Sequence, residues 1–265
     1  MIKEIKEIIL FLLIIVSLYI VIKLSSPRLN SAIIVEPRKH AALEKVIMNI
    51  YNNLNIPIII FHGTENEDFV KNIVDRNCIN KYQLVNIDKK NLNIPSYNKL
   101  LYSLDFWEKA SYFGDKILLF QTDSGIYGQF SDIKDILQYD FCGAPWLIKG
   151  HTEFNAVKYF SKEFNNSRPV FVGNGGFSLR SCKMMIKLIN KYNPLGFKNI
   201  IPEDVFFANA CDMTSGCKLS NVEDAKKFSI AYPAEFPYKS FGFHQYWKAC
   251  EFGKEIEKLQ YSLKN

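Results

Sequence analysis

The stretch from 116 to 128, KILLFQTDSGIYG, constrains the fold more than any other part of the chain. Its apolar run from Ile117 to Phe120 has the length and flanks of a strand that is buried on both faces. Polar residues follow at once, so a carboxylate, Asp123, stands at the carboxyl end of this strand. Because ligands bind at that edge of open α/β sheets, Asp123 is a candidate binding residue. An Asp in this place also initiates turns, here before Gly125, and the stretch alone favours neither interpretation.

Strand-like and helix-like segments alternate before this stretch. Apolar runs predict buried strands over 31–35 and within 56–63, with helical spacing over 41–51 between them. A strand, a helix and a second strand in succession are typical of a parallel sheet. The other elements predicted before the central strand are a helix over 67–74, a strand over 82–87 and one helix over 97–113.

Two segments after the central strand stand out among the helices predicted at 131–139, 181–191 and from 202 and 253 onward. Residues 147–169 are polar and weakly periodic, which predicts a mobile loop of the kind that closes over substrates. Residues 170–179, VFVGNGGFSL, place two apolar arms about Asn174-Gly175, a strong signal for a tight hairpin turn. The glycines exceed what a turn needs and would also let the backbone approach a ligand, so both interpretations stand.

Size and charge limit the classes of function. The chain has 265 residues, 48% of them hydrophobic, which suits one full core and leaves little room for two large domains. Its net charge of +6 suits anionic small molecules or a membrane surface. No dense Lys/Arg cluster is interleaved with aromatic residues, so no nucleic-acid partner is expected.

The cysteines bear on metal sites and on the compartment. None of the six forms a CxxC pair, which argues against a structural zinc site. Cys211 and Cys217 are close enough in sequence to bridge in an oxidising compartment, and buried free thiols fit equally well. Asn165-Asn166-Ser167 is a glycosylation sequon, which has meaning only in that same compartment.

The N-terminal segment carries fifteen residues, 8–22, whose apolar run is interrupted only by Ser17 and Tyr19. As a helix it would span roughly 22 Å, which approaches the hydrocarbon core of roughly 30 Å if flanking lysines snorkel and neighbouring residues join in. The residues before Ser25 lack the small side chains that signal-peptide cleavage requires. We therefore expect residues 1–30 to be a signal anchor with a short linker, in contact with the membrane through 8–24, and residues 31–265 to be the catalytic domain. A cleaved signal peptide and a buried helix are the alternatives, and the flanking charges do not indicate the orientation.

Few motifs of known chemistry are present. The absence of GxGxxG, P-loop, GxSxG and HExxH patterns argues against dinucleotide enzymes, P-loop kinases, α/β-hydrolases and zincins. The remaining candidates are Asp123, the glycine-rich segment 173–176, the acidic pair Glu203 and Asp204, and His244. The acidic pair at a helix start also suits the helix dipole without further function, and His244 also suits simple packing.

Four motifs in order, QTDS (121–124), GAPW (143–146), GNGGFSLRS (173–181) and PEDVFFA (202–208), together with a late His, resemble an uncharacterised glycosyltransferase-like domain family. The resemblance covers nearly all of the chain after about residue 31. It implies the GT-A fold, an α/β architecture with a single Rossmann-like mixed sheet flanked by helices, preceded here by an N-terminal membrane helix in type II orientation. It also implies a nucleotide-sugar donor and a glycan or glycoprotein acceptor.

The resemblance implies roles for individual residues. In GT-A enzymes a DxD motif binds a divalent metal, Mn²⁺ or Mg²⁺, and QTD matches its last acid with Asp123 while Gln121 stands where the first acid would be. His244 would be a further metal ligand. The catalytic base would come from Asp204 or Glu203. The other expected donor-binding residues are Arg38, His62, Asn98, Lys99, Gln121 and Ser124, and the expected acceptor-binding residues are Trp146, Gly173, Asn174, Gly175 and Gly176.

These residues predict a membrane-anchored, inverting, metal-assisted glycosyltransferase. The first alternative is a nucleotidyltransferase on a similar sheet, which would release pyrophosphate instead of a nucleoside diphosphate. The second is a non-catalytic sugar-binding membrane protein. This alternative is favoured by Gln121, which stands where the first acid of the DxD motif would be.

Overall fold

A mixed six-stranded sheet forms the centre of the computed structural model, which describes residues 11–16, 27–147, 149, 152–232 and 239–261. The strand order is β3-β2-β1-β4-β7-β6. The strands are β1 (Ser31–Glu36), β2 (Ile58–His62), β3 (Tyr82–Asn86), β4 (Lys116–Phe120), β6 (Phe141–Gly143) and β7 (Phe177–Ser181). The first four run parallel, whereas β7 is antiparallel to both β4 and β6. The predicted central strand is therefore confirmed as β4, at the junction of the parallel and antiparallel halves.

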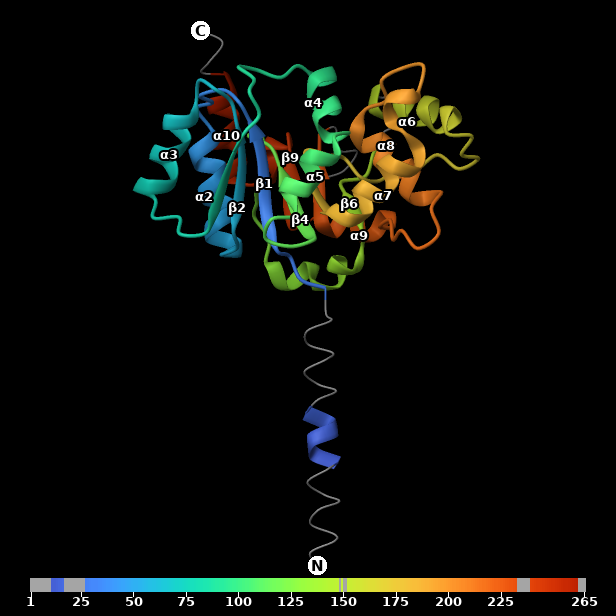
Figure 1. Cartoon of the computed structure of the whole chain (residues 1–265), viewed down its shortest axis with the longest axis horizontal. Helices are drawn as coiled ribbons and strands as arrows, with labels where there is room; N and C mark the ends of the chain where they lie inside the picture. Colours follow the sequence, from blue (N-terminus) through green and yellow to red (C-terminus); the bar gives the residue numbers. More distant parts are fainter. Residues whose placement is uncertain (1–10, 17–26, 148, 150–151, 233–238, 262–265) are drawn as a thin grey trace, which may run out of the picture.

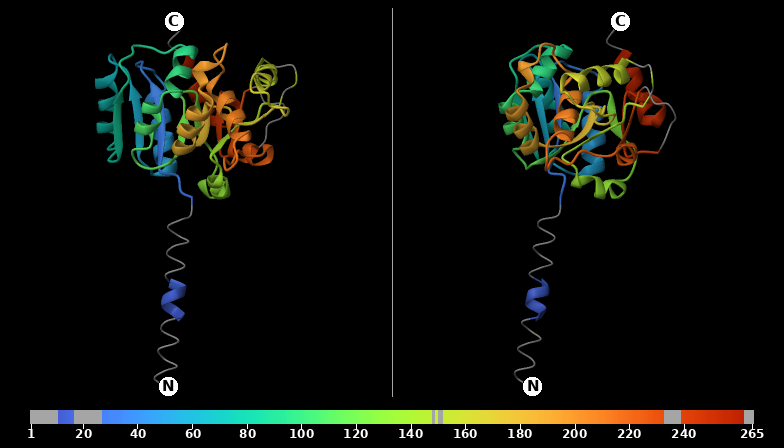
Figure 2. Two further views of the ribbon diagram at one scale, coloured as in Figure 1. Left: turned by 45° about the vertical axis from the view of Figure 1, so that its right-hand side comes forward. Right: turned by 90° about the vertical axis from the view of Figure 1, so that its right-hand side faces the viewer.

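Helices cover both faces of this sheet (Figure 1, Figure 2). They are α2 (Leu43–Leu54), α3 (Glu67–Arg76), α4 (Ile94–Leu101), α5 (Leu104–Ala110), α6 (Thr152–Glu163), α7 (Cys182–Tyr192), α8 (Glu203–Asp212), α9 (Val222–Phe228) and α10 (Glu251–Tyr261), with 3₁₀ turns at Phe130–Gln138, Pro194–Gly196 and Trp247–Ala249. Successive residues of β4 face opposite sides: Leu119 joins one buried cluster with α5, α7 and α8, and Phe120 joins another with α2, α3 and α10. This two-sided burial explains why the strand is a continuous apolar run.

A second sheet corrects the expectation of a single one. It has three strands in the order β5-β9-β8, formed by β5 (Ser124–Ile126), β9 (Gly242–His244) and β8 (Ser229–Ala231). The chain leaves the main sheet at a tight turn, where the Ser124 hydroxyl accepts a hydrogen bond from the Gln121 N–H (3.0 Å) and donates to the Gln121 carbonyl (2.8 Å). Ser124 then pairs with His244 in the antiparallel β5-β9 ladder. This turn brings the late His beside the strand-end acid.

The helix predicted over 97–113 is two helices, α4 and α5. The break follows Tyr102, whose hydroxyl donates a hydrogen bond to the Ile201 carbonyl (2.6 Å). The Trp107 indole N–H donates to the Leu101 carbonyl (2.7 Å), which the broken helix leaves without its usual partner. Contacts with distant segments therefore override a continuous helical spacing.

The mobile loop expected at 147–169 is largely a helix. α6 occupies Thr152–Glu163, with Val157 and Phe164 buried against the core. Phe160 also packs against this core, and the Phe154 ring stacks on that of Phe171, with the ring centres 4.6 Å apart. α6 also packs against α8, where the Ser161 hydroxyl donates a hydrogen bond to the Asn209 amide oxygen (3.0 Å).

The structure describes the N-terminal segment only in part. Within the described ranges, no helix has both the length and the apolar character needed to cross a membrane. The anchor expected at 8–24 lies outside the described residues except for 11–16, which are helical and exposed.

Cys211 and Cys217 form a disulfide that ties the end of α8 to the following loop. The sequence left open a disulfide or two free thiols, and the structure contains the disulfide.

Candidate active site

A pocket of about 480 Å³ lies at the carboxyl ends of β1 and β4. This is the edge at which ligands bind in open α/β sheets. In Figure 1, β1 starts at the lower edge of the domain and runs upward, so these strand ends lie at the upper edge beside α4 and α10. The polar residues that line the pocket include Glu36, Arg38, Asn93, Tyr97, Asn98, Gln121, Thr122, Asp123, Asn174, Glu203, Asp204, His244, Gln245 and Gln260.

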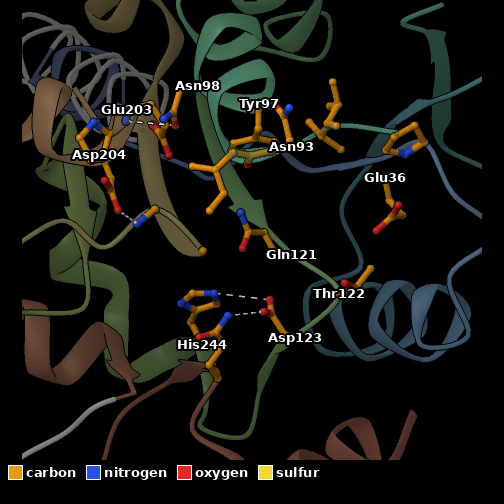
Figure 3. Close-up of a pocket in the computed structure, with 18 of the residues that line it drawn as sticks. Glu36, Asn93, Tyr97, Asn98, Gln121, Thr122, Asp123, Glu203, Asp204 and His244 are labelled. Carbon is orange, nitrogen blue, oxygen red and sulfur yellow. Dashed lines mark hydrogen bonds and ion pairs between the residues drawn. The ribbon is translucent and has the colours of Figure 1, made fainter. Parts of the chain in front are cut away.

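Asp123 and His244 form one end of the site (Figure 3). The Asp123 Oδ1 atom lies 3.4 Å from His244 Nε2, and its Oδ2 atom accepts a hydrogen bond from the Gln245 side chain (2.7 Å). Gln245 also donates its backbone N–H to the Asp123 carbonyl (2.9 Å) from a left-handed conformation, φ 52°. Burial by itself raises the pKa of Asp123, but the neighbouring His244 and the Gln245 hydrogen bond hold that pKa below its ordinary value. The carboxylate is therefore ionised at neutral pH.

Three buried polar atoms of this end have no hydrogen-bond partner in the described part of the chain: Asp123 Oδ1 and both ring nitrogens of His244. Buried polar atoms are normally paired, so these atoms are suited to a ligand. A carboxylate oxygen next to an imidazole nitrogen fits a divalent cation. Among the described residues no three His, Cys, Asp or Glu side chains gather as a metal site, so phosphate oxygens and water would have to complete the coordination.

The 173–176 segment is a loop and not the turn of a hairpin, which corrects one of the two interpretations of its sequence. Residues 170–174 are not a strand; the segment runs beside the GAPW motif, with the Trp146 N–H donating to the Phe171 carbonyl (2.9 Å). A β-carbon at Gly176 would lie 2.2 Å from the His244 ring, and one at Gly175 would lie 2.3 Å from Glu203 Oε1. These glycines make room for the acidic and imidazole side chains of the site.

Glu203, at the first position of α8, is held in a buried ion pair. Its two carboxylate oxygens accept hydrogen bonds from the Arg180 guanidinium at 2.5 and 3.0 Å. Arg180 is fully buried, with its guanidinium carbon 4.8 Å from the centre of the Phe141 ring and 5.6 Å from that of Phe207. Because both oxygens pair with a buried cation, protonation of Glu203 would break the ion pair, so Glu203 has little capacity to accept a proton from a substrate.

Asp204, the next residue, forms the opposite end of the site. It is half-buried, and its Oδ2 accepts the Gly175 N–H (3.0 Å) while its Oδ1 accepts the Val205 N–H (2.8 Å). Burial, together with the negative charge of Glu203, raises the pKa of Asp204 to about 6. A carboxylate with this pKa is ionised at neutral pH and is a better base than an ordinary Asp.

The structure gathers ten of the predicted site residues in this pocket and leaves five outside its lining. Those in the lining are Arg38, Asn98, Gln121, Asp123, Asn174, Gly175, Gly176, Glu203, Asp204 and His244. Some of them also stabilise the walls of the pocket. Asn98 accepts the Glu203 N–H (3.3 Å) at the start of α8, and Arg38 pairs with Glu36 (2.8 Å).

The five residues outside the lining are His62, Lys99, Ser124, Trp146 and Gly173. His62 is buried with its ring against the Gly63 carbonyl (2.8 Å), and Ser124 closes the turn after β4. Trp146 is buried in the core. Lys99 lines a separate pocket with Pro194, Leu195, Phe197, Asn199 and Ile200. Local sequence signals selected these five residues, and the fold does not bring them into the lining of the pocket.

Sequence reasoning did not select Glu36, Tyr97 or Gln245, which also line the pocket. Glu36 ends the first strand in SAIIVEP as Asp123 follows the fourth, so a strand-end acid was visible in the sequence. Gln245 follows the late His directly, but nothing local indicates that its side chain reaches Asp123.

One known protein family matches this chain. Residues 81–244, more than half of the chain, match a family described as a protein of unknown function, DUF5672. The chain belongs to this family. No curated protein matches it. Most residues that line the pocket lie within the matched range, and the others come from 35–38 before it and from Gln245 and Gln260 after it.

Among solved structures, the chain is similar to mouse xyloside xylosyltransferase 1 in its apo form, with a TM-score of 0.50 and 8% identity over 84% of this chain and 99% of that one. It also matches core-mannan synthase A (CmsA/Ktr4) from Aspergillus fumigatus in its Mn/GDP form, with a TM-score of 0.41 and 11% identity over 70% of each chain. The DUF5672 chain therefore shares the fold of the mouse glycosyltransferase, in agreement with the GT-A resemblance of its motifs.

Proposed function

We propose that the chain is a glycosyltransferase that moves a sugar from a nucleotide-sugar donor to a hydroxyl group of a glycan or glycoprotein. The observation that carries the proposal is the layout of one pocket. Asp123, whose Oδ1 atom accepts no hydrogen bond, and the imidazole of His244 lie at one end, and Asp204 with its raised pKa lies at the other. The fold shared with the mouse xylosyltransferase supports the reaction class.

The Asp123 end would bind the leaving group. Asp123 Oδ1 and His244 would hold Mn²⁺ or Mg²⁺ together with the diphosphate oxygens of the donor, and the bound cation would neutralise charge on the departing nucleoside diphosphate. Gln245 occupies Asp123 Oδ2 and so leaves Oδ1 to bind the cation. The half-exposed guanidinium of Arg38, which also lines the pocket, adds positive charge for the phosphates.

The Asp204 end would activate the acceptor. The acceptor oxygen attacks the anomeric carbon, the bond from that carbon to the diphosphate oxygen breaks, and the hydroxyl proton passes to the Asp204 carboxylate. A single direct displacement inverts the configuration at the anomeric carbon. Glu203 would hold the neighbouring Asp204 in place, since its ion pair with Arg180 anchors the start of α8.

The membrane anchor is a further part of the proposal. Residues 8–24 would insert in the membrane as a single span in type II orientation. Residues 27–30 enter the domain at the edge opposite the pocket (Figure 1), so an anchor there would leave the pocket open to donor and acceptor. The Cys211–Cys217 disulfide agrees with an oxidising lumen for this domain.

The test is a binding and turnover screen of the chain without residues 1–26 against UDP, GDP and CMP sugars, with and without Mn²⁺. We expect one nucleotide class to bind more tightly with Mn²⁺ and to release a nucleoside diphosphate, or the monophosphate for CMP sugars. Asp123→Asn should lose the Mn²⁺-dependent part of the binding. No binding of any nucleotide would exclude the proposal.

The same screen separates the alternatives. Release of pyrophosphate from a nucleoside triphosphate would identify a nucleotidyltransferase. Binding of a glycan array by the chain without turnover of any donor would identify a sugar-binding protein, which is the outcome that Gln121 in place of a first acid would explain.

A further inference from the structure

Tyr97 carries a hydroxyl group that the Gln121 side chain approaches but that makes no hydrogen bond of normal geometry in the described part of the chain. It lies in α4 and lines the pocket. Its hydroxyl oxygen is buried and has no hydrogen-bond partner in the described part of the chain. Tyr102, five residues later, shows the contrast, because its buried hydroxyl donates to the Ile201 carbonyl (2.6 Å). A buried hydroxyl that borders a pocket and lacks a partner is suited to a ligand.

The charges that act on this hydroxyl come from the Asp204 side of the site. Burial raises the pKa of Tyr97, the charges of Glu203 and Asp204 raise it further, and a hydrogen-bonding interaction with the Gln121 side chain acts in the opposite direction. The phenol is therefore neutral and can both donate and accept a hydrogen bond. In Figure 3, Gln121 lies between Tyr97 on one side and the Asp123 and His244 pair on the other.

The proposed reaction requires the sugar to lie in this same interval. In a direct displacement the anomeric carbon stands between the departing diphosphate, at Asp123 and His244, and the oxygen activated by Asp204. The ring of the transferred sugar must then border the wall of the pocket between those groups. Tyr97 and Gln121 line the pocket beside this interval, with Gln121 the nearer of the two to Asp123 (Figure 3).

We propose that the Tyr97 hydroxyl binds a hydroxyl group of the transferred sugar and thereby selects which donor sugars the pocket accepts. This inference rests on the proposed function and adds to it the subsite of the sugar ring. A pocket built to hydrogen-bond a substrate hydroxyl discriminates against analogues that lack it, because the protein group is then left unpaired.

The experiment compares full-length wild type with Tyr97→Phe by calorimetry in Mn²⁺, using UDP, UDP-glucose, GDP and GDP-mannose and then the monodeoxy analogues of whichever sugar binds. We expect Tyr97→Phe to bind the bare nucleotide as wild type does and to bind the nucleotide sugar about tenfold more weakly, the loss of one hydrogen bond. One deoxy analogue should bind wild type about tenfold more weakly than its parent sugar, and Tyr97→Phe should not distinguish the two.

The matched control is Tyr102→Phe, which removes a buried hydroxyl at the end of the same helix whose partner is protein. This variant should lose thermal stability and keep the wild-type ratio of sugar to nucleotide affinity. Nucleotide binding with an unchanged ratio in Tyr97→Phe would overturn the Tyr97 inference alone. An equal loss of bare-nucleotide affinity would also overturn it. Absence of binding by wild type to these nucleotides and to CMP and its sugars would overturn the proposed function and this inference with it.

Discussion

Two aspartates stand at opposite ends of one pocket and have opposite electrostatic surroundings. Asp123 follows a buried strand and faces His244 and the Gln245 amide, which keep its pKa low. Asp204 starts a helix beside the negative charge of Glu203, and burial with this charge raises its pKa to about 6. The same side chain is thus suited to holding a cation at one end and to accepting a proton at the other. Neighbouring groups, and not residue type, decide the chemistry.

The largest effect is expected from Asp204→Asn. Removal of a general base lowers turnover by about 10² to 10⁴. Nucleotide binding in Mn²⁺ should stay at the wild-type level, because the variant leaves Asp123 and His244 unchanged. Single-turnover kinetics and calorimetry on one preparation measure both quantities. Unchanged turnover would move the base to Glu203 or exclude the inverting route.

Glu203→Gln should act on stability more than on chemistry. It leaves the fully buried Arg180 without a counter-charge, which lowers the free energy of unfolding by about 3–5 kcal/mol. Denaturant unfolding measures the change. Glu223→Gln is the control, since the Glu223–Lys226 pair is exposed and contributes at most about 1 kcal/mol. A Glu203→Gln variant with wild-type stability and no turnover would give Glu203 a catalytic role instead.

Gln245→Asn tests how Asp123 is oriented. Asn adopts the left-handed backbone of this position, but its shorter side chain does not reach Asp123 Oδ2. Loss of a group that orients a metal ligand weakens metal binding by about 10- to 100-fold. Titration with Mn²⁺, followed by electron paramagnetic resonance, measures the affinity. Gln260→Asn, a pocket residue that contacts the Thr122 carbonyl, should leave it unchanged, and equal losses in both variants would contradict the orienting role.

The dependence of kcat/KM on pH tests the difference in pKa between Asp204 and Asp123. Because the base must be ionised, kcat/KM should fall about tenfold per pH unit below about pH 6, through protonation of Asp204. Asp123, with its lowered pKa, should keep its charge through this range, so this fall should come from Asp204 alone and be absent from the residual activity of Asp204→Asn. A fall of the same size in the Asp204→Asn variant would contradict the assignment.

The raised pKa also affects stability. The folded-state pKa of Asp204 lies above the ordinary value of 3.8, so its ionised form destabilises the fold above about pH 6, and this penalty disappears as the pH falls below about 4. The stability of Asp204→Asn relative to wild type should therefore be higher at pH 7 than at pH 4. Thermal unfolding at the two pH values measures it.

Much of the parallel half of the fold could be predicted from the sequence, because its signals are local. The apolar run before Asp123 specified β4, and alternating apolar and helical segments specified β1, α2, β2, α3 and β3. The predictions were wrong where distant contacts decide. The helical spacing over 97–113 is interrupted at Tyr102 by its bond to Ile201, and the apolar arms about Asn174 pair with other segments and not with each other.

Residue types and their order in the sequence determined which chemistry this protein could carry: a strand-end acid, an acidic helix start and a late His. Only the tertiary structure decided which of them meet. The turn closed by Ser124 sends β5 against β9 and so places His244 beside Asp123. The buried Arg180 forms an ion pair with Glu203, whereas Asp204 in the same pocket accepts hydrogen bonds from backbone N–H groups. Such outcomes depend on burial and charge between segments far apart in the chain, and no local pattern encodes them.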